Sequence, residues 1–463
     1  MDASLEPAEG EFRAAADQTV AVLAQFLDGL DQAPAVGPGL SERLAAELAR
    51  APGESPREWS ELLDTVRRAA DCAVEAAGPR YLGYIPGGGL VTSALGEFLA
   101  RVLNRYTGLS GLAPGPVALE EGVLGWLCQL FGLPRGSGGL LTTGGSMAAL
   151  SALVAARVDR LGDPAAAGML YVSDQTHHTV AKAARIAGLP ARCVRTVPTT
   201  AQLRLDLAAA TEMIRADRTA GLDPFLLVAT AGTTNTGTID PLDDLAELAT
   251  AEGLWLHVDA CYGGFFQLTD RGHARLRGIE QADSVALDPH KSLFLPYGTG
   301  VLLARDRSTL AAGHTDADDG GADYLADLNH STLPDYTDLG PELTREHRGL
   351  GLWLPLHHHG LAAFRDALDE KLDLAARAYQ QLADDPRLEV PLAPELTTVV
   401  FRPRSGGDAA AQTLLDRVNA TRRAFLSSTR LRGQLTLRLS ILAHRTHQPH
   451  VADALAAISE NLD

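Results

Sequence analysis

The chain has 463 residues, of which 46% are hydrophobic and 21% are charged. That balance is typical of a globular protein with two or three domains and argues against a disordered or fibrous chain. A formal net charge of −18 argues against nonspecific nucleic-acid binding, which needs a cationic surface to neutralise phosphates.

Targeting and redox features of the sequence predict a soluble protein of the cytoplasm. The N-terminal MDASLEPAEGEF has no apolar signal region, and no stretch reaches the roughly 20 apolar residues of a membrane span. The cysteines at positions 72, 128, 193 and 261 show no CxxC or ladder spacing, which favours free thiols in a reducing compartment. We therefore expect neither a membrane nor a nucleic acid among the partners of the chain.

Residues 1–86 are predicted to form a helical N-terminal arm. Amphipathic patterns indicate helices over 11–30, 41–50 and 56–77, with the Pro/Gly-rich QAPAVGPGL after the first. Because three helices without a strand make a poor core, we expect the arm to pack against another surface, such as a partner subunit. The Gly/Pro-rich segment at 78–90 then predicts a loop that enters the main body.

Residues 87–350 are predicted to form a large α/β domain. Within it, short apolar runs alternate with helical stretches, which is typical of a mostly parallel sheet covered by helices. Ligands bind such sheets at the carboxyl ends of the strands, so functional residues are expected in the loops that follow them. The expected strands are 139–142, 169–172, 225–229, 254–258, 284–287 and 300–304.

Residues 351–463 are predicted to form a smaller α+β domain, because the regular alternation of strands and helices ends there. The expected elements are a helix at 361–383, a strand at 397–402, a helix at 408–426, a strand at 434–442 and a final helix from 449.

Two charged residues directly after predicted strands point to a cofactor. Lys291 lies in DSVALDPHKSLF, and Asp259 lies in LWLHVDACYGG, where the preceding run is almost wholly apolar. A carboxylate in such a place is unfavourable unless it is paired with a cation, whereas a lone loop lysine is ordinarily solvated. Pyridoxal 5′-phosphate (PLP) needs an amine for an imine and a carboxylate that keeps its pyridine nitrogen protonated. We therefore predict PLP, with Lys291 as the amine and Asp259 as the carboxylate.

The segment GLLTTGGSMAALSALVAAR predicts a strand, a Gly-Gly-Ser turn and a helix that could bind the phosphate of this cofactor. Free N–H groups and the dipole at a helix N-terminus favour an anion, and the glycines allow close approach of the backbone. An ordinary tight turn is the alternative explanation of the same pattern. The phosphate candidates are Ser146, Met147, the hydroxyl of Ser284, and His290.

Two further loops after predicted strands carry polar residues. YVSDQTHHTV holds His177 and His178, and an imidazole there could stack on a pyridine ring or transfer protons. VATAGTTNTGTIDPL holds Thr233 and Thr234. The alternatives are solvated histidines and threonines that simply cap a turn.

These motifs together resemble the group II pyridoxal-phosphate-dependent decarboxylases, the aromatic-L-amino-acid and glutamate decarboxylase family of fold-type I. The similarity extends over nearly the whole chain, from GPRYLGYIPGGG through HVDACYGG and DPHK to FLSSTRLRGQLTLRLSILAHRT. The resemblance implies the fold-type I PLP-dependent transferase fold and a homodimer with shared active sites. It also implies a lyase without a metal, acting on a small-molecule amino acid.

Residue by residue, the resemblance implies roles around the cofactor ring. Lys291 matches the lysine that carries the cofactor as an imine, Asp259 the partner of the pyridinium nitrogen, and His177 the histidine stacked over the ring. Cys261 falls beneath the ring, where the family usually has alanine, and Thr234 falls near the ring substituents.

The resemblance also implies residues at the phosphate and the substrate. Arg438 is similar to an arginine near the substrate carboxylate, with a structural salt bridge as the alternative, and Tyr81 would line the pocket. Tyr324, in GADYLADLNHS, matches a loop tyrosine that protonates the carbanion left by loss of CO₂, with a partly buried surface residue as the alternative. The phosphate positions are Ser146, Met147, Asp288 and His290.

The chain departs from the family pattern in two places. Met147, Ala148 and Ala149 stand where the family often has Asn or Glu, so phosphate contacts there must rely on Ser146 and the backbone. Gly351 replaces the lysine of a common RRxRxLKxW pattern.

We expect decarboxylation of an L-amino acid to the amine and CO₂. Little positive charge near the expected pocket, beyond Arg80 and Arg105, favours an aromatic or bulky apolar substrate. One alternative is decarboxylation coupled to oxidative deamination, which gives an aldehyde; relatives of that kind tend to lose the loop tyrosine or alter the histidine, and both are present here. The other alternative is a noncatalytic regulator, which would have little use for the lysine, aspartate and histidine together.

Overall fold

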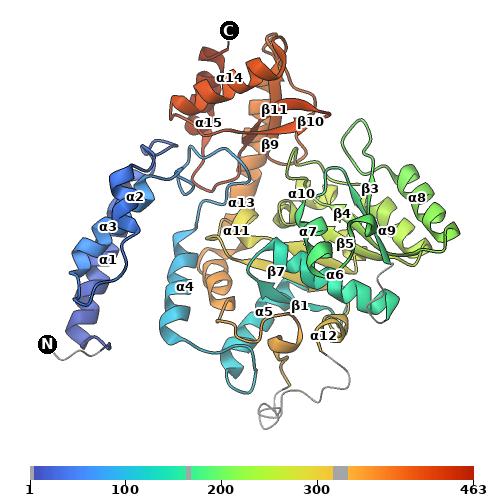
Figure 1. Ribbon diagram of the computed structural model, residues 1–463, viewed down its shortest axis with the longest axis horizontal. Coiled ribbons are helices and arrows are strands. Elements are labelled where there is room, and N and C mark those ends of the chain that lie inside the picture. Colours follow the sequence, from blue (N-terminus) through green and yellow to red (C-terminus); the bar gives the residue numbers. More distant parts are fainter. Residues whose placement is uncertain (1–4, 163–167, 316–331, 463) are drawn as a thin grey trace.

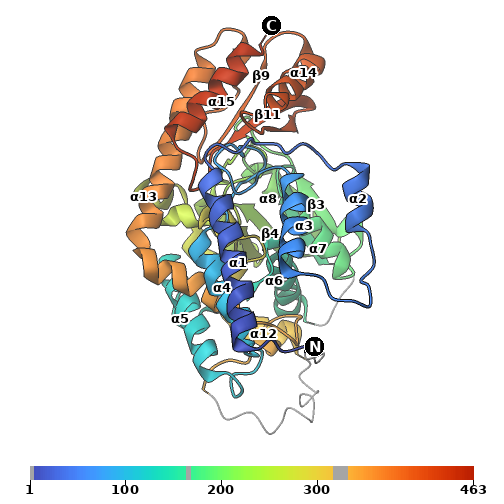
Figure 2. The ribbon, with the colours of Figure 1, turned by 90° about the vertical axis from the view of Figure 1, so that its left-hand side faces the viewer.

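The computed structural model describes residues 5–162, 168–315 and 332–462, which form a helical arm, a large seven-stranded sheet and a small four-stranded sheet (Figure 1). Figure 2 shows the small sheet and its helices at one end of the molecule, together with the C-terminus. Among the described residues, no helix has both the length and the apolar character needed to cross a membrane.

The large sheet has the strand order β1-β7-β6-β5-β4-β2-β3, and its strands β6, β5, β4, β2 and β3 run parallel. Strand β7 pairs antiparallel with both neighbours. The predicted mostly parallel α/β sheet is therefore confirmed. Its strands are β1 (Gly138–Thr142), β2 (Gly168–Ser173), β3 (Val194–Val197), β4 (Asp223–Thr230), β5 (Trp255–Asp259), β6 (Ser284–Leu287) and β7 (Gly300–Ala304).

Helices cover this sheet, which explains why its strands are nearly continuous apolar runs. Every residue of β1, β2, β6 and β7 is buried. The edge strand β3 was not predicted, because its sequence VRTV is half polar and only Val197 is buried. The helices of this part are α4 (Val91–Leu103), α5 (Pro114–Leu130), α6 (Gly145–Leu161), α7 (Thr179–Ile186), α8 (Leu207–Thr219), α9 (Leu242–Ala251), α10 (Asp270–Arg275), α11 (Pro289–Ser292) and α12 (Ser308–His314).

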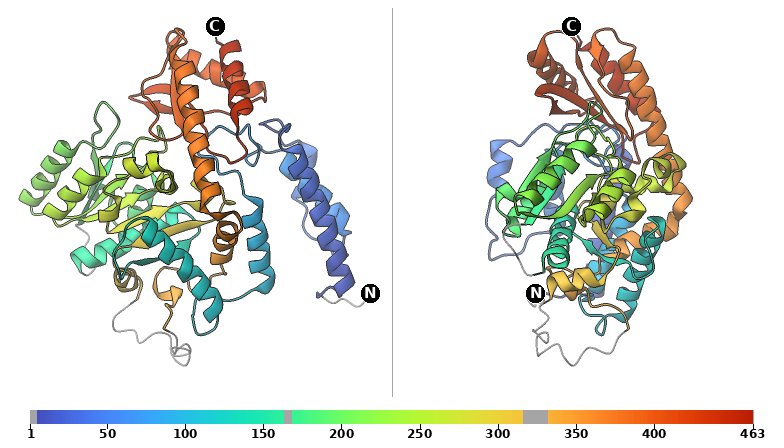
Figure 3. Two further views of the ribbon diagram at one scale, coloured as in Figure 1. Left: turned by 180° about the vertical axis from the view of Figure 1, so that it is seen from behind. Right: turned by 90° about the vertical axis from the view of Figure 1, so that its right-hand side faces the viewer.

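A long helix, α13 (Gly349–Ala383), joins the two sheets (Figure 3). Gly360, with φ 75° and ψ 157°, is not helical and divides this element into two helical segments. The second segment confirms the helix predicted at 361–383, whereas the segment before Gly360 was not predicted. The predicted boundary at 351 falls in its first turn, and the division into 1–86, 87–350 and 351–463 stays a prediction.

The small sheet has the order β10-β11-β9-β8, with antiparallel neighbours throughout. The helix predicted at 408–426 ends at Ala420, because the strand β10, which was not predicted, follows it and forms a hairpin with β11. Arg432 and Gly433 form the two-residue turn of this hairpin, and both have positive φ. The elements are β8 (Leu388–Glu389), β9 (Thr398–Pro403), α14 (Gly407–Ala420), β10 (Ser427–Leu431), β11 (Gln434–Ser440) and α15 (Gln448–Glu460).

The predicted arm consists of α1 (Glu9–Gly29), α2 (Glu42–Leu48) and α3 (Trp59–Asp71). None of the three helices has a buried residue. The arm lies to one side of the large sheet, on the side of α4 (Figures 1 and 3). Its base is tied to the small domain by the Ala35 N–H, which donates to the Arg422 carbonyl. The arm therefore has no core of its own.

A buried ion pair supports the end of β1, just before the predicted phosphate turn. Arg345 donates to Glu120 at 2.6 Å, and the two side chains are 2% and 0% exposed. Arg345 and Arg348 both donate to the Leu141 carbonyl, at 3.1 and 3.2 Å. Buried charges persist only when paired and hydrogen-bonded, so this network fixes the strand end from which the turn leaves.

Candidate active site

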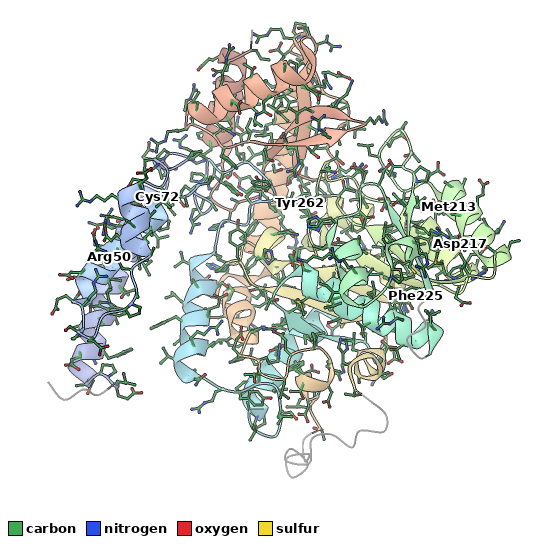
Figure 4. All side chains as sticks on the ribbon, viewed as in Figure 1. Arg50, Cys72, Met213, Asp217, Phe225 and Tyr262 are labelled. Carbon is green, nitrogen blue, oxygen red and sulfur yellow. The ribbon has the colours of Figure 1, made fainter. Side chains whose placement is uncertain are left out.

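A cavity of about 360 Å³ lies where the carboxyl ends of β4, β5 and β6 meet the N-terminus of α6. This is the edge of the sheet at which the sequence predicted the functional residues. Tyr262, labelled near the centre of the molecule in Figure 4, also lines the cavity. Eight predicted site residues line it: Ser146, His177, Thr234, Asp259, Cys261, Asp288, His290 and Lys291.

Lys291 lies in the short helix α11, four residues after β6 ends. Its Nζ is 2.8 Å from a carboxylate oxygen of Asp288. Burial disfavours the charged amine, but the attraction of Asp288 outweighs it, so the pKa of Lys291 lies above its ordinary value. The resting amine is therefore a paired ammonium that needs to lose a proton before it can attack a carbonyl.

The chain contains three lysines, and only one of them lines the cavity. Lys371 is fully buried and donates to Glu370 and to the Thr446 carbonyl. Lys182 lies on α7 with an exposed side chain. Lys291 is thus the amine available to a ligand in this cavity.

Asp259 is the last residue of β5, and its register partner in β6 is Ala286. One of its carboxylate oxygens accepts a hydrogen bond from the Cys261 N–H at 3.1 Å. The parallel pairing of β5 and β6 brings this carboxylate and Lys291 to the same edge of the sheet. Asp259 also lines the cavity, so its carboxylate is accessible to a ligand there.

His177 lies between β2 and α7, and its Nδ1 is 2.8 Å from the Thr179 hydroxyl. The Thr179 N–H also donates to Nδ1, at 3.4 Å, which places the proton of the neutral ring on Nε2. Burial lowers the pKa of His177, against the opposing attraction of Asp259. The ring is therefore neutral at neutral pH.

The predicted phosphate turn forms as expected. Gly144 has φ 145°, a backbone region that favours glycine, and α6 begins at Gly145. Among the described residues, the N–H and the hydroxyl of Ser146 have no hydrogen-bond partner, and Ser146 lines the cavity. Met147 does not line the cavity, and its N–H donates to the Gly144 carbonyl at 3.0 Å. The predicted Met147 contact is therefore not supported, and Ser146 remains as the donor.

The prediction that Ser284 binds the phosphate is wrong. Ser284 begins β6, so the length of the strand separates it from the carboxyl edge where the cavity lies. Its fully buried hydroxyl accepts a hydrogen bond from the Trp255 indole and contacts His257 Nδ1, both at 2.8 Å.

Asp288 lines the cavity, but as an acceptor. One of its oxygens accepts from the Gly145 N–H at 2.7 Å, and the other pairs with Lys291. A carboxylate has no proton to donate to a phosphate, so the predicted direct phosphate contact of Asp288 is corrected to a contact with the turn.

Neither predicted substrate residue is among the described residues that line the cavity. Arg438 donates to the carbonyls of Tyr84, Thr234 and Asn235 and to the Ser427 hydroxyl. Burial lowers the pKa of its guanidinium to about 10. Among the described residues Arg438 forms no salt bridge, so the alternative role of a structural salt bridge is not supported. Arg438 thus holds the loop that carries Thr234. Tyr81 stacks on Phe425, with the ring centroids 5.5 Å apart.

The predicted proton donor Tyr324 lies outside the described residues, and its role stays a prediction.

Sequence reasoning missed Thr179, Gly232 and Tyr262, which line the cavity. Thr179 could have been predicted from the sequence, because it follows His177 by two residues. The motif DACYGG contains Tyr262, for which the sequence indicated no role. Its hydroxyl is hydrogen-bonded to the hydroxyls of Thr397 and Thr398 and so links the site to the small domain.

The residues present fit PLP. An amine, a carboxylate and a helix N-terminus with a free donor surround one cavity, as an aldehyde, a pyridine nitrogen and a phosphate require. Fold and site together define a PLP-dependent enzyme built on a mostly parallel sheet.

Comparison with known proteins specifies the family. A family model described as the pyridoxal-dependent decarboxylase conserved domain matches residues 42–404. The aromatic-L-amino-acid decarboxylase of Bacillus atrophaeus is 32% identical over 96% of this chain and 94% of its own. The phenylacetaldehyde synthase of Arabidopsis thaliana is 30% identical over 92% and 90%. The solved structure of Oryza sativa TDC with PLP and tryptamine superposes with a TM-score of 0.92, at 26% identity over 99% of both chains.

The chain belongs to the pyridoxal-dependent decarboxylase family. Its fold is that of fold-type I, its cofactor is PLP, and it is an amino acid carboxy-lyase, so the noncatalytic alternative is not supported.

The turn at Gly144 also depends on Gly300, the first residue of β7. A Cβ at Gly300 would lie 2.5 Å from the Gly144 Cα and 2.6 Å from the Thr142 hydroxyl. We predict that Gly300→Ala displaces the turn and weakens PLP binding by about 10-fold or more, because an overpacked core forces backbone shifts. Titration of the PLP-free protein with PLP measures this effect. Gly125→Ala, on α5 with nothing within 4 Å, is the control and should leave PLP affinity unchanged. Equal affinities of the two variants would contradict the prediction.

Proposed function

We propose that the chain converts an aromatic L-amino acid to the corresponding amine and CO₂. The observation that carries the proposal is the grouping of Lys291, Asp259 and His177 around one cavity at the carboxyl edge of the sheet. The Bacillus atrophaeus relative is named for aromatic L-amino acids, and the Oryza sativa structure contains tryptamine. Both names support an aromatic substrate here.

The charge of the cavity favours a substrate with an uncharged side chain. Its described lining contains two carboxylates, Asp259 and Asp288, and no arginine. An acidic side chain would therefore meet like charge without a dedicated cation. Aromatic rings lie beside this wall, since Phe425 contacts both Tyr81 and Tyr84, and Arg438 links the Tyr84 carbonyl to that of Thr234. We infer that an aromatic side chain is accommodated on this side.

When bound, PLP supplies a protonated ring that takes up the electron pair released as the bond between Cα and the carboxylate breaks. In the proposed mechanism, the Asp259 carboxylate holds the proton on the ring nitrogen. Lys291 would hold the cofactor through its Nζ, and His177 would lie against the ring. Tyr324 donates a proton to Cα. Cys261, Thr234, Ser146 and His290 complete the proposed cofactor contacts.

The second candidate is decarboxylation with oxidative release of an aldehyde. The match to a phenylacetaldehyde synthase supports it, because the alignment with this chain covers 90% of the length of that protein. The presence of His177 at the cavity and of Tyr324 in the sequence supports simple decarboxylation instead.

We predict that a panel of L-amino acids will give amine and CO₂ in equal amounts from aromatic substrates, without aldehyde or hydrogen peroxide. The measurement follows all four products in one incubation. Lys291→Ala is the control, and it should lose both the reaction and the visible absorbance of the bound cofactor. Aldehyde with an equal amount of peroxide would favour the second candidate. Turnover of acidic and not of aromatic amino acids would contradict the proposed substrate.

We further propose a homodimer with shared active sites. Helix α4 exposes a continuous apolar stripe, whose side chains are 46% to 58% exposed, and the arm beside it lacks a core of its own. An apolar stripe of this kind on a helix ordinarily packs against another surface. A second copy that covers α4 and the arm would bury it. The stripe consists of Leu95, Phe98, Leu99, Val102 and Leu103.

Light scattering on the purified protein should give twice the chain mass of 48.9 kDa. Leu99→Asp should shift the protein toward the monomer, because it places a charge in the apolar contact. Ile186→Asp, on the exposed surface of α7 with a side chain 61% exposed, is the matched control and should stay dimeric. A wild-type protein of 48.9 kDa would contradict the proposed dimer.

We also propose a cytoplasmic location. All four cysteines lie within the described residues, and none of them forms a disulfide. Thiols that stay reduced are typical of proteins in a reducing compartment, which supports this location.

A further inference from the structure

A carboxylate occupies the anion-binding end of α6. Asp288, only 3% exposed, accepts the Gly145 N–H at 2.7 Å with one oxygen and lies 2.8 Å from Lys291 Nζ with the other. The first N–H of the helix and the amine are two groups that a phosphate-bearing aldehyde would use. In the protein alone, an acidic side chain holds both.

The surroundings offer little to balance a second anion. Lys291 is the one lysine of the described lining, and its ammonium is already paired with Asp288. His290 donates from Nδ1 to the Thr299 carbonyl at 2.7 Å, and its Nε2 lies 3.7 Å from Asp288. Among the described residues, the remaining donors at the turn are the N–H and hydroxyl groups of Thr143 and Ser146. A phosphate bound there lies next to the Asp288 carboxylate, and like charges at such range repel strongly in a buried site.

We propose that Asp288 is a positioning residue that limits the affinity of the site for the phosphate of PLP. Its carboxylate holds the Gly145 turn and Lys291 in place before the cofactor enters, and it opposes the phosphate afterwards. The consequence is a cofactor that exchanges with solution, so that the fraction of active enzyme follows the supply of PLP. This inference rests on the proposed roles of Lys291 and of the turn at Gly144.

The test compares PLP with pyridoxal, which has the aldehyde and the ring but no phosphate. Asp288→Asn keeps an acceptor for the Gly145 N–H, removes the charge and adds a donor that can face a phosphate. Loss of the pair with Lys291 changes the dissociation constants of PLP and pyridoxal by the same factor. Only the repulsion between Asp288 and the phosphate changes the ratio of these constants. We therefore expect the preference for PLP over pyridoxal to rise by about 10-fold or more.

Both dissociation constants come from titrations of the cofactor-free protein, followed by the visible absorbance of the bound ligand. The release rate of PLP after dilution should fall in the same variant. Asp283→Asn is the matched control. Asp283 is a carboxylate just before β6 that accepts the Leu256 N–H at 2.7 Å, at the end of the strand away from the cavity. Its substitution should leave the ratio of the two constants unchanged.

An unchanged or lower preference for PLP in Asp288→Asn would overturn the inference. Asp288→Ser provides a second neutral variant, and it should raise the preference in the same direction if charge is the cause. The proposed function fails in a different measurement, namely the absence of amine and CO₂ from the wild-type protein with aromatic amino acids.

Discussion

The parallel pairing of β5 with β6 is the constraint on which the site depends. It aligns Asp259 with Ala286, so that the carboxylate at the end of one strand and the lysine just beyond the next emerge at one edge. Helices cover the strands, and the buried pair of Arg345 with Glu120 fixes the end of β1. The turn at Gly144 leaves from that strand end toward the same cavity. Three groups far apart in sequence are thus fixed by sheet geometry.

The charged groups that line the cavity interact with neighbouring residues. Lys291 is paired with Asp288 and therefore stays an ammonium until a ligand displaces the pair. Asp259 lines the same cavity, and one of its oxygens accepts a hydrogen bond from the Cys261 N–H. His177 is neutral because burial disfavours its charged form. In the proposed mechanism, the same few charges act on the ring of the cofactor and on its phosphate.

The sequence predicted the sheet and the residues whose position follows from the end of a strand, such as Lys291, Asp259 and His177. Ser284 is the first residue of the strand predicted at 284–287, so its position at the amino end, away from the cavity, could have been inferred from the sequence. Arg438 could not be placed from sequence, because its partners are carbonyls of distant loops. Strand β3 was missed because an exposed edge strand lacks the apolar signal.

The central claim is that Lys291 binds the cofactor, and a chain with only three lysines allows a direct measurement. Sodium borohydride would reduce the bond between lysine and PLP in the loaded protein, and mass spectrometry of its peptides would locate the phosphopyridoxyl group. We expect the group on Lys291, with Lys182 and Lys371 unmodified. A group on Lys182 or Lys371, with Lys291 unmodified, would contradict the assignment from which the site and its mechanism are built.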